Sequence, residues 1–303
     1  MEGLPNVIII GVTKAGTTSL RQYLIDHPAI SGAKIKETFF WNRNDAIYQP
    51  DLERYKAIFP EANTHIVLDN TPRYFHDLHQ NCDLLKTHLG KDLKVILILR
   101  EPKGRVFSFY KFKKRRLEID EQVDFTQYVQ QSLAASDEEK RASNELLAGI
   151  DEGCYDGPLK NWEIAFGENL KVVFFDQLKS DPTACTQSIL KWLNLDSSFY
   201  NDYDFKKENQ SVGFKNKGLH QFGMTMYKTL EPILLKNKGF RRFITNMYYR
   251  MNGKAIEEKM TDETKSQLDQ SYADSLIKLS ALESIKKSEF KPNWIKEWAR
   301  FQL

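Results

Sequence analysis

The chain has 303 residues, 41% of them hydrophobic, which is enough to bury a sizeable core in one large α/β domain. Its 44 basic and 41 acidic residues give a net charge of +3. This balance argues against a general nucleic-acid binder, so we expect no nucleic-acid partner and predict that any anion site depends on local placement of charge.

Cysteine usage and hydropathy bear on the cellular compartment. The three cysteines, Cys82, Cys154 and Cys185, are widely spaced and odd in number, which favours free thiols in a reducing compartment. No apolar run approaches the ~20 residues that span a bilayer, and Pro5 and a strand-like run follow Met1 too closely for a signal peptide. We predict a chain without a membrane span, either cytoplasmic or a catalytic domain cut from a longer, membrane-anchored parent.

Apolar runs of strand length alternate with segments of helical periodicity. Strands are predicted over residues 7–10, 65–68, 94–99 and 170–175, and helices over 17–27, 77–89, 106–116, 155–166 and from Asp181 onward. Continuous β-branched runs are typical of strands buried on both faces. The alternation predicts a doubly wound parallel sheet.

The pattern beyond about residue 215 is helical and rich in lysine and aromatic residues. We therefore predict a single domain over residues 1–303. A cofactor-binding α/β core would occupy 1–220, and a helical C-terminal extension, 221–303, would pack on it.

A glycine-containing loop joins the first predicted strand to the first helix. Gly11 and Gly16 permit a tight turn whose backbone N–H groups and helix dipole face an anion. The usual triphosphate loop has lysine directly after its second glycine. Here Thr17 holds that position and the lysine comes earlier, as Lys14, which suits a single phosphate carrying a leaving group. The alternative is a simple glycine turn.

An arginine and a serine follow the strand over 94–99. Arg100 lies where a parallel strand ends, the edge at which open α/β sheets bind ligands. Its guanidinium offers a bidentate fork for phosphate, and the Ser108 hydroxyl adds a donor. The two could hold the same anion, although Arg100 alone could equally form a surface ion pair.

These two motifs resemble those of a known enzyme family. Residues 6–20, N-V-I-I-I-G-V-T-K-A-G-T-T-S-L, resemble the 5'-phosphosulfate loop of sulfotransferases that use 3'-phosphoadenosine-5'-phosphosulfate (PAPS), closest to the heparan-sulfate-type and bacterial branches. Residues 100–110 resemble the family's 3'-phosphate motif, R-x-P-x-x-R-x-x-S-x-Y. The resemblance covers residues 5 to about 220.

The resemblance implies a P-loop sulfotransferase fold and transfer of a sulfuryl group from PAPS to a hydroxyl or amine. The product would be 3'-phosphoadenosine 5'-phosphate (PAP), and the acceptor a carbohydrate or small molecule. Lys14 would stabilise charge on the bridging oxygen, and no metal is required. Cofactor-binding residues would be Lys14, Ala15, Gly16, Thr17, Thr18, Ser19, Arg100, Ser108, Tyr155, Lys215, Lys217 and Gly218.

A candidate general base lies in the segment Lys36-Glu37-Thr38-Phe39-Phe40-Trp41. Burial of Glu37 against three aromatic residues would raise the pKa of its carboxyl toward working pH, which suits a base. The segment resembles the K-E-x-x-F-F stretch that supplies the family's catalytic glutamate. The alternatives are a surface glutamate, or a histidine base at His65, His76 or His79.

Residues 69–75, D-N-T-P-R-Y-F, resemble the E-K-T-P-x-Y-F segment that lines the family's cleft. Asn70 stands where the glycosaminoglycan enzymes usually carry lysine, so a cation is missing and a heparan-like acceptor is in doubt. Arg73 could take over part of that role.

Two further segments resemble the family. The G-x-Y-x-x-x-L-x-x-W-x-x-x-F spacing from Gly153 to Phe166 is mainly a helical core stripe, with Tyr155 placed to touch ligand. Residues 209–218 fit a late cofactor-closing loop, with Lys215 and Lys217 as candidates. Two rival functions remain at this point: a P-loop kinase using ATP and Mg²⁺, and a non-catalytic nucleotide-binding scaffold of the same fold.

Overall fold

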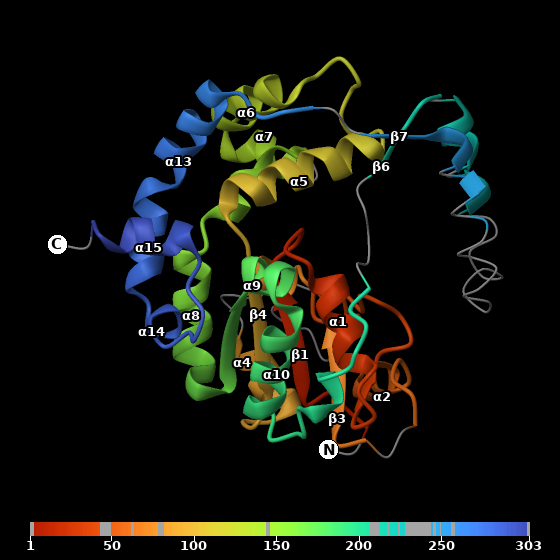
Figure 1. The fold of residues 1–303 in the computed structure, drawn as a ribbon, viewed down its shortest axis with the longest axis vertical. Helices are drawn as coiled ribbons and strands as arrows, with labels where there is room; N and C mark the ends of the chain where they lie inside the picture. The colour runs from red at the N-terminus through yellow and green to blue at the C-terminus, as the bar shows by residue number, and fades with distance from the viewer. Residues whose placement is uncertain are drawn as a thin grey trace.

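A computed structural model gives the fold of the chain (Figure 1). It describes residues 3–42, 50–61, 64–77, 82–143, 146–206, 212–216, 218–223, 225–227, 244, 247–248, 250–255 and 258–301. Its centre is a five-stranded sheet in which every pair of neighbouring strands is parallel, in the order β2-β3-β1-β4-β5. The strands are β1 (Val7–Gly11), β2 (Ile30–Gly32), β3 (Ile66–Asn70), β4 (Lys94–Leu99) and β5 (Leu170–Phe174).

Helices follow the strands along the chain. They are α1 (Thr17–Ile25), α2 (Leu52–Lys56), α3 (Tyr74–Asp77), α4 (Cys82–Leu89), α5 (Pro102–Arg115), α6 (Phe125–Ala134), α7 (Asp137–Ala142), α8 (Asp156–Phe166), α9 (Phe175–Ser180), α10 (Pro182–Trp192), α13 (Asp262–Ala281), α14 (Glu283–Lys286) and α15 (Asn293–Ala299). Two short strands, β6 (Val212–Phe214) and β7 (Gly253–Ala255), form an antiparallel pair.

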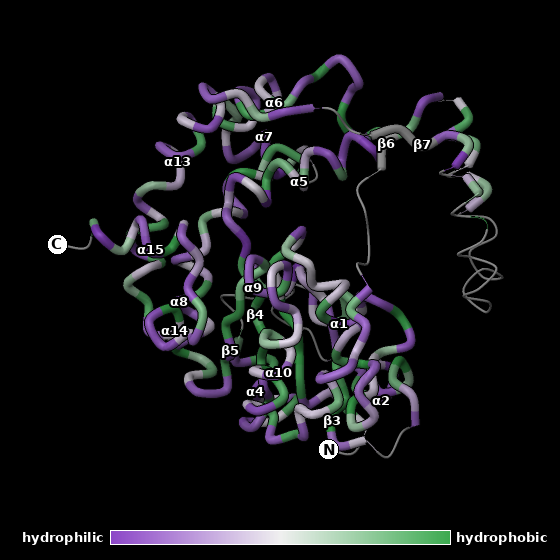
Figure 2. Tube along the Cα trace, in the orientation of Figure 1, coloured by the Kyte–Doolittle hydropathy of each residue, from purple (hydrophilic) through white to green (hydrophobic). Residues whose placement is uncertain are grey.

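The sheet forms the core because its strands are apolar along their whole length. All five residues of β1 are buried, as are five of the six in β4, and Figure 2 shows hydrophobic residues concentrated in the strands. Among the covering helices, α1 packs with α10 and α4 packs with α8. The predicted doubly wound parallel sheet is confirmed.

The predicted elements agree closely with the observed ones. The strands predicted over 7–10, 65–68, 94–99 and 170–175 correspond to β1, β3, β4 and β5. Asp181 caps α10 by accepting a hydrogen bond from the backbone N–H of Ala184, with Pro182 in the first turn. Within the helix predicted over 77–89, the structure shows α4 over Cys82–Leu89, and residues 78–81 lie outside the described residues.

From Asp262 onward the described part of the chain is helical, as expected. Helix α13 packs against α5 and α8, and α14 packs against β5. The β6–β7 pair lies in an arm that extends from the body at the right of Figure 1. The organisation of residues 1–303 as a single domain stays a prediction. Within the described ranges, no helix combines the length and apolar character needed to cross a membrane.

Candidate active site

A cavity of about 990 Å³ lies where β1, β3 and β4 end. Eight of the residues predicted from the sequence line it: Lys14, Gly16, Thr17, Thr18, Ser19, Glu37, Arg100 and Ser108. They come from three separate segments of the chain, which the strand order brings together.

The loop between β1 and α1 has the geometry of an anion cradle. Gly16 precedes α1 with φ 89°, and a Cβ at this position would lie 2.9 Å from the Phe175 ring. Glycine is therefore required both by conformation and by space. The first N–H groups of α1 have no acceptor within the helix. With Thr17 and Thr18 lining the cavity, this end of the helix suits a phosphate or sulfate group.

Arg100 connects the two motifs. Its Nη1 donates a hydrogen bond to the carbonyl oxygen of Lys14 over 2.9 Å, and its guanidinium lies 4.5 Å from the centre of the Phe175 ring. The Tyr155 hydroxyl donates to the Arg100 carbonyl over 3.0 Å. Burial lowers the pKa of Arg100, yet an arginine starting so far above neutrality stays charged.

Lys14 is a cation surrounded mainly by other cations. Its Nζ lies 4.1 Å from the centre of the Phe112 ring. Burial, with the charges of Arg115, Lys36 and Arg100, lowers the pKa of Lys14 to about 8, while Glu37 opposes this shift. An anion bound beside Lys14 would relieve the repulsion and favour its charged form.

Glu37 is placed differently from the expected aromatic enclosure. Its Oε1 lies 2.8 Å from the Lys36 Nζ, and its side chain is 27% exposed. Phe40 and Trp41 pack instead on Tyr55, with ring centres 4.3 and 5.3 Å away. The Glu37 carboxylate is therefore paired with a cation rather than enclosed by aromatic rings.

A buried network fixes the loop that carries Glu37. The Thr38 backbone N–H donates to Thr71 Oγ1 over 3.0 Å, and the Thr38 hydroxyl donates to Asp69 Oδ2 over 2.9 Å. Tyr55 donates to the same carboxylate oxygen over 2.7 Å. Asp69 is fully buried, and this burial raises its pKa. The network ties Glu37 to the end of β3.

The second arginine of the 3'-phosphate motif, Arg105, supports the loop rather than lining the cavity. Its side chain is fully buried and donates to Glu152 Oε2 over 2.9 Å, to Thr13 Oγ1 over 3.3 Å and to the Gly149 carbonyl. Burial opposes ionisation of Glu152, but the charges of Arg105, His76 and Arg73 and the Arg105 hydrogen bond together lower the pKa of that carboxyl. No sequence pattern pointed to Glu152, because its partners are distant in the chain.

Other predicted residues lie away from the cavity surface. Ala15 is fully buried in the loop, and Tyr155 is fully buried beneath Arg100. Lys215 and Gly218 are exposed near the β6–β7 pair and do not line the cavity. Lys217 and His79 lie outside the described residues.

The cavity is far more positive than the chain as a whole. Over the described residues its lining holds two acidic side chains, Glu37 and Glu118, against nine basic ones: Lys14, Lys36, Arg73, Arg100, Lys111, Lys113, Arg115, Arg116 and Lys179. Four of these come from the last two turns of α5 and its end, where the sequence carries a basic run over residues 111–116. Such a field attracts anionic ligands.

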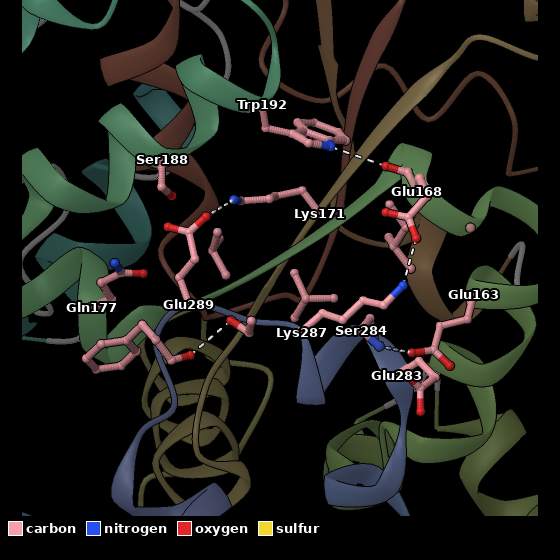
Figure 3. Close-up of a pocket in the computed structure, with 16 residues that line it drawn as sticks. Glu163, Glu168, Lys171, Gln177, Ser188, Trp192, Glu283, Ser284, Lys287 and Glu289 are labelled. Carbon is pink, nitrogen blue, oxygen red and sulfur yellow. Dashed lines mark hydrogen bonds and ion pairs between the residues drawn. The ribbon is translucent and has the colours of Figure 1, made fainter.

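A second hollow of about 230 Å³ lies beside β5, where Figure 3 shows its charged side chains turned toward one another. Lys171 pairs with Glu289 over 3.2 Å and Lys287 with Glu168 over 2.7 Å. Over the described residues its lining holds four acidic side chains against two basic ones, which makes it a weaker candidate for an anion site than the large cavity.

Comparison with known proteins agrees with this geometry. Residues 4–283 match the sulfotransferase domain family, and the chain belongs to that family. It is therefore a sulfotransferase, an enzyme that transfers a sulfuryl group. The structure also resembles the crystal structure of a sulfotransferase from Alicyclobacillus acidocaldarius, with a TM-score of 0.66 and 20% identity over 98% of this chain and 99% of that one. This likeness confirms the P-loop sulfotransferase type of fold.

The curated relatives are enzymes of heparan sulfate. The chain is 28% identical over 269 residues to the mouse heparan sulfate glucosamine 3-O-sulfotransferase 5, covering 84% of this chain and 74% of that protein. It is 27% identical over 207 residues to the human bifunctional heparan sulfate N-deacetylase/N-sulfotransferase 3, covering 64% of this chain. The aligned part is only 23% of that longer relative.

Proposed function

We propose that the donor is PAPS and that the large cavity binds it. PAPS supplies a sulfuryl group joined as an anhydride to its 5'-phosphate. The observation that carries the proposal is the bond from Arg100 Nη1 to the Lys14 carbonyl, which unites a glycine-bounded anion loop with a second basic group at one cavity. A donor with phosphates at both its 5' and 3' positions fits two such groups.

The donor-binding residues divide between the two motifs. Gly16, Thr17 and Thr18 hold the 5'-phosphate through the first turn of α1. Arg100 and Ser108 hold the 3'-phosphate, and so select PAPS over ATP. The buried Ala15 and Tyr155 support the loop and Arg100 from behind. Contributions from Ser19, Lys215, Lys217 and Gly218 stay predictions.

Two residues carry the chemistry in this proposal. Glu37 removes the proton from the acceptor hydroxyl or amine as that atom attacks sulfur. Lys14 stabilises the negative charge that develops on the bridging oxygen as the S–O bond breaks. In-line transfer of this kind depends on positioning and charge stabilisation. The hydrogen bonds to Asp69 position the loop that carries Glu37, and the Arg105–Glu152 pair positions the loop that carries Lys14.

For the acceptor, we propose an acidic carbohydrate. The named relatives are enzymes of heparan sulfate, and the nine basic residues of the cavity exceed what one donor molecule would neutralise. A small-molecule acceptor is the alternative. All three cysteines are free thiols, which supports the expectation of a reducing compartment.

The test of the donor is a calorimetric comparison of PAP with ADP at equal ionic strength. Selection by Arg100 and Ser108 predicts that PAP binds at least about tenfold more tightly, since a charged hydrogen bond contributes about 1.5–3 kcal/mol. Equal affinities would reject PAPS as the donor. A kinase would instead bind ATP more tightly in the presence of Mg²⁺, and a scaffold would bind PAP without turning over PAPS.

A further inference from the structure

Arg73 is a cavity-lining cation that the donor assignments leave without a role. It follows β3, in the segment where Asn70 replaces the lysine expected from the family pattern. Asn70 is fully buried, its Nδ2 donates to the Lys36 carbonyl over 3.4 Å, and it does not line the cavity. Arg73, by contrast, lines the cavity with a side chain that is 25% exposed.

The Arg73 guanidinium is held in a defined orientation. Its Nε and Nη2 donate to the two carboxylate oxygens of Asp77 over 3.3 and 3.2 Å, and its Nη1 lies 3.9 Å from Glu152 Oε1. A pre-oriented guanidinium loses less conformational entropy when it binds an anion. Glu152 also accepts from Thr13 of the anion loop over 3.4 Å, so Arg73 and that loop share one support.

The strand order places Arg73 on the acceptor side of the cavity. β1, which leads into the anion loop, lies between β3 and β4. Arg100 and Ser108 follow β4, whereas Arg73 follows β3. The Thr38–Thr71 hydrogen bond joins the Glu37 loop to the same end of β3. Arg73 and the loop of the proposed base are therefore both attached at the β3 end of the cavity, whereas the residues assigned to the 3'-phosphate follow β4 on the other side of β1.

We propose that Arg73 binds a carboxylate of the acceptor, close to the hydroxyl or amine that receives the sulfuryl group, and so makes the enzyme select acidic acceptors. This inference rests on the proposed function, because it needs an acceptor in the cavity. Arginine suits the role because its planar guanidinium matches a carboxylate. Asp77 is a positioning residue that sets the plane of that guanidinium.

The experiment uses two acceptors that differ only in their carboxylates: a desulfated heparan sulfate hexasaccharide and the same hexasaccharide with its carboxylates reduced to alcohols. The intact chain and its Arg73→Ala, Arg73→Lys and Asp77→Asn variants are compared for kcat and KM on both. Arg141→Ala is the matched control, because Arg141 is exposed on α7 and lies outside the cavity. PAP affinity is measured for every variant.

Arg73→Ala should raise KM for the acidic hexasaccharide about tenfold or more and leave KM for the reduced one nearly unchanged. Arg73→Lys should restore part of the loss, Asp77→Asn should show a smaller loss of the same kind, and PAP affinity should not move. Equal losses on both acceptors, or a parallel loss of PAP affinity, would overturn the inference. A wild-type preference for neither acceptor would overturn it while leaving sulfuryl transfer intact; transfer to neither acceptor would reject the proposed acceptor class as well.

Discussion

The Arg100 side chain is hydrogen-bonded to the backbone of Lys14, Nη1 to carbonyl oxygen, over 2.9 Å. One residue that we assign to the 3'-phosphate therefore also holds the loop that carries the proposed catalytic lysine. The contact couples recognition of the donor's distal phosphate to the geometry at the bond that breaks. Changes at Arg100 should consequently affect both affinity and turnover.

Arg100→Ala should weaken PAP binding by about one to two decades and leave ADP binding nearly unchanged, because it removes a charged hydrogen bond to a group that ADP lacks. Isothermal titration calorimetry with both nucleotides measures this directly. Arg141→Ala, on the surface of α7, is the control and should bind both as the wild type does. An equal loss for PAP and ADP would mean that Arg100 only supports the loop.

Lys14 should take up a proton when PAP binds in alkaline buffer. Its pKa in the free protein is about 8, so at about pH 9 the amine is mostly neutral, and a bound anion should raise the pKa and favour the ammonium. Calorimetry in buffers of different ionisation enthalpy gives the number of protons. Lys14→Met should abolish the uptake.

The same pKa sets the sign of the pH dependence of activity. If the charged amine is needed, kcat/KM should fall as pH rises through about 8, because the free enzyme then loses the Lys14 proton. A profile unchanged between wild type and Lys14→Met would show that this limb belongs to another group.

Lys14→Ala should lower kcat more than donor affinity, since the stabilised charge develops only in the transition state.

Glu37→Gln keeps the size of the side chain and removes the base. We expect kcat to fall by about 10²–10⁴-fold while PAP affinity stays close to the wild-type value. Steady-state kinetics on the best acceptor, with calorimetry for PAP, separates the two effects. Retention of most activity would move proton removal to another group. His65 and His76 are the alternatives within the described residues, and a histidine base would give a rate that rises near pH 6.5.

Asp69→Asn should destabilise the fold and misplace the Glu37 loop. The buried carboxylate accepts from Thr38, Tyr55 and Thr71, and an amide cannot accept through its nitrogen. A buried donor left unsatisfied costs about 1–3 kcal/mol, which urea unfolding measures. Tyr55→Phe removes a single donor and keeps the carboxylate, so it should show a smaller loss of stability and near-normal kcat. If Asp69→Asn kept wild-type kcat, the network would have no part in placing Glu37.

The predictable parts of the structure were those encoded locally. The runs in β1 and β4 are buried on both faces, and the glycines and the arginine that follow them are read directly from the sequence, so both segments that line the cavity and are proposed to bind the donor could be named in advance. The sequence could not predict the roles of Asp69, Glu152 and Arg105, because these roles depend on which strands lie side by side. The prediction that aromatic residues enclose Glu37 was wrong for the same reason. Phe40 and Trp41 pack on Tyr55 of α2, a helix that the sequence pattern did not predict.

The most direct test of the central claim is transfer of label from sulfur-labelled PAPS to the heparan-type hexasaccharide, measured for the wild type, Lys14→Ala and Arg141→Ala. The account predicts acceptor-dependent label in the carbohydrate for the wild type and for Arg141→Ala. For Lys14→Ala it predicts a loss of about 10²-fold or more, the scale found when one charge-stabilising donor is removed from an active site. Label transfer that is equal in wild type and Lys14→Ala, or no transfer together with Mg²⁺-dependent phosphorylation from ATP, would contradict it.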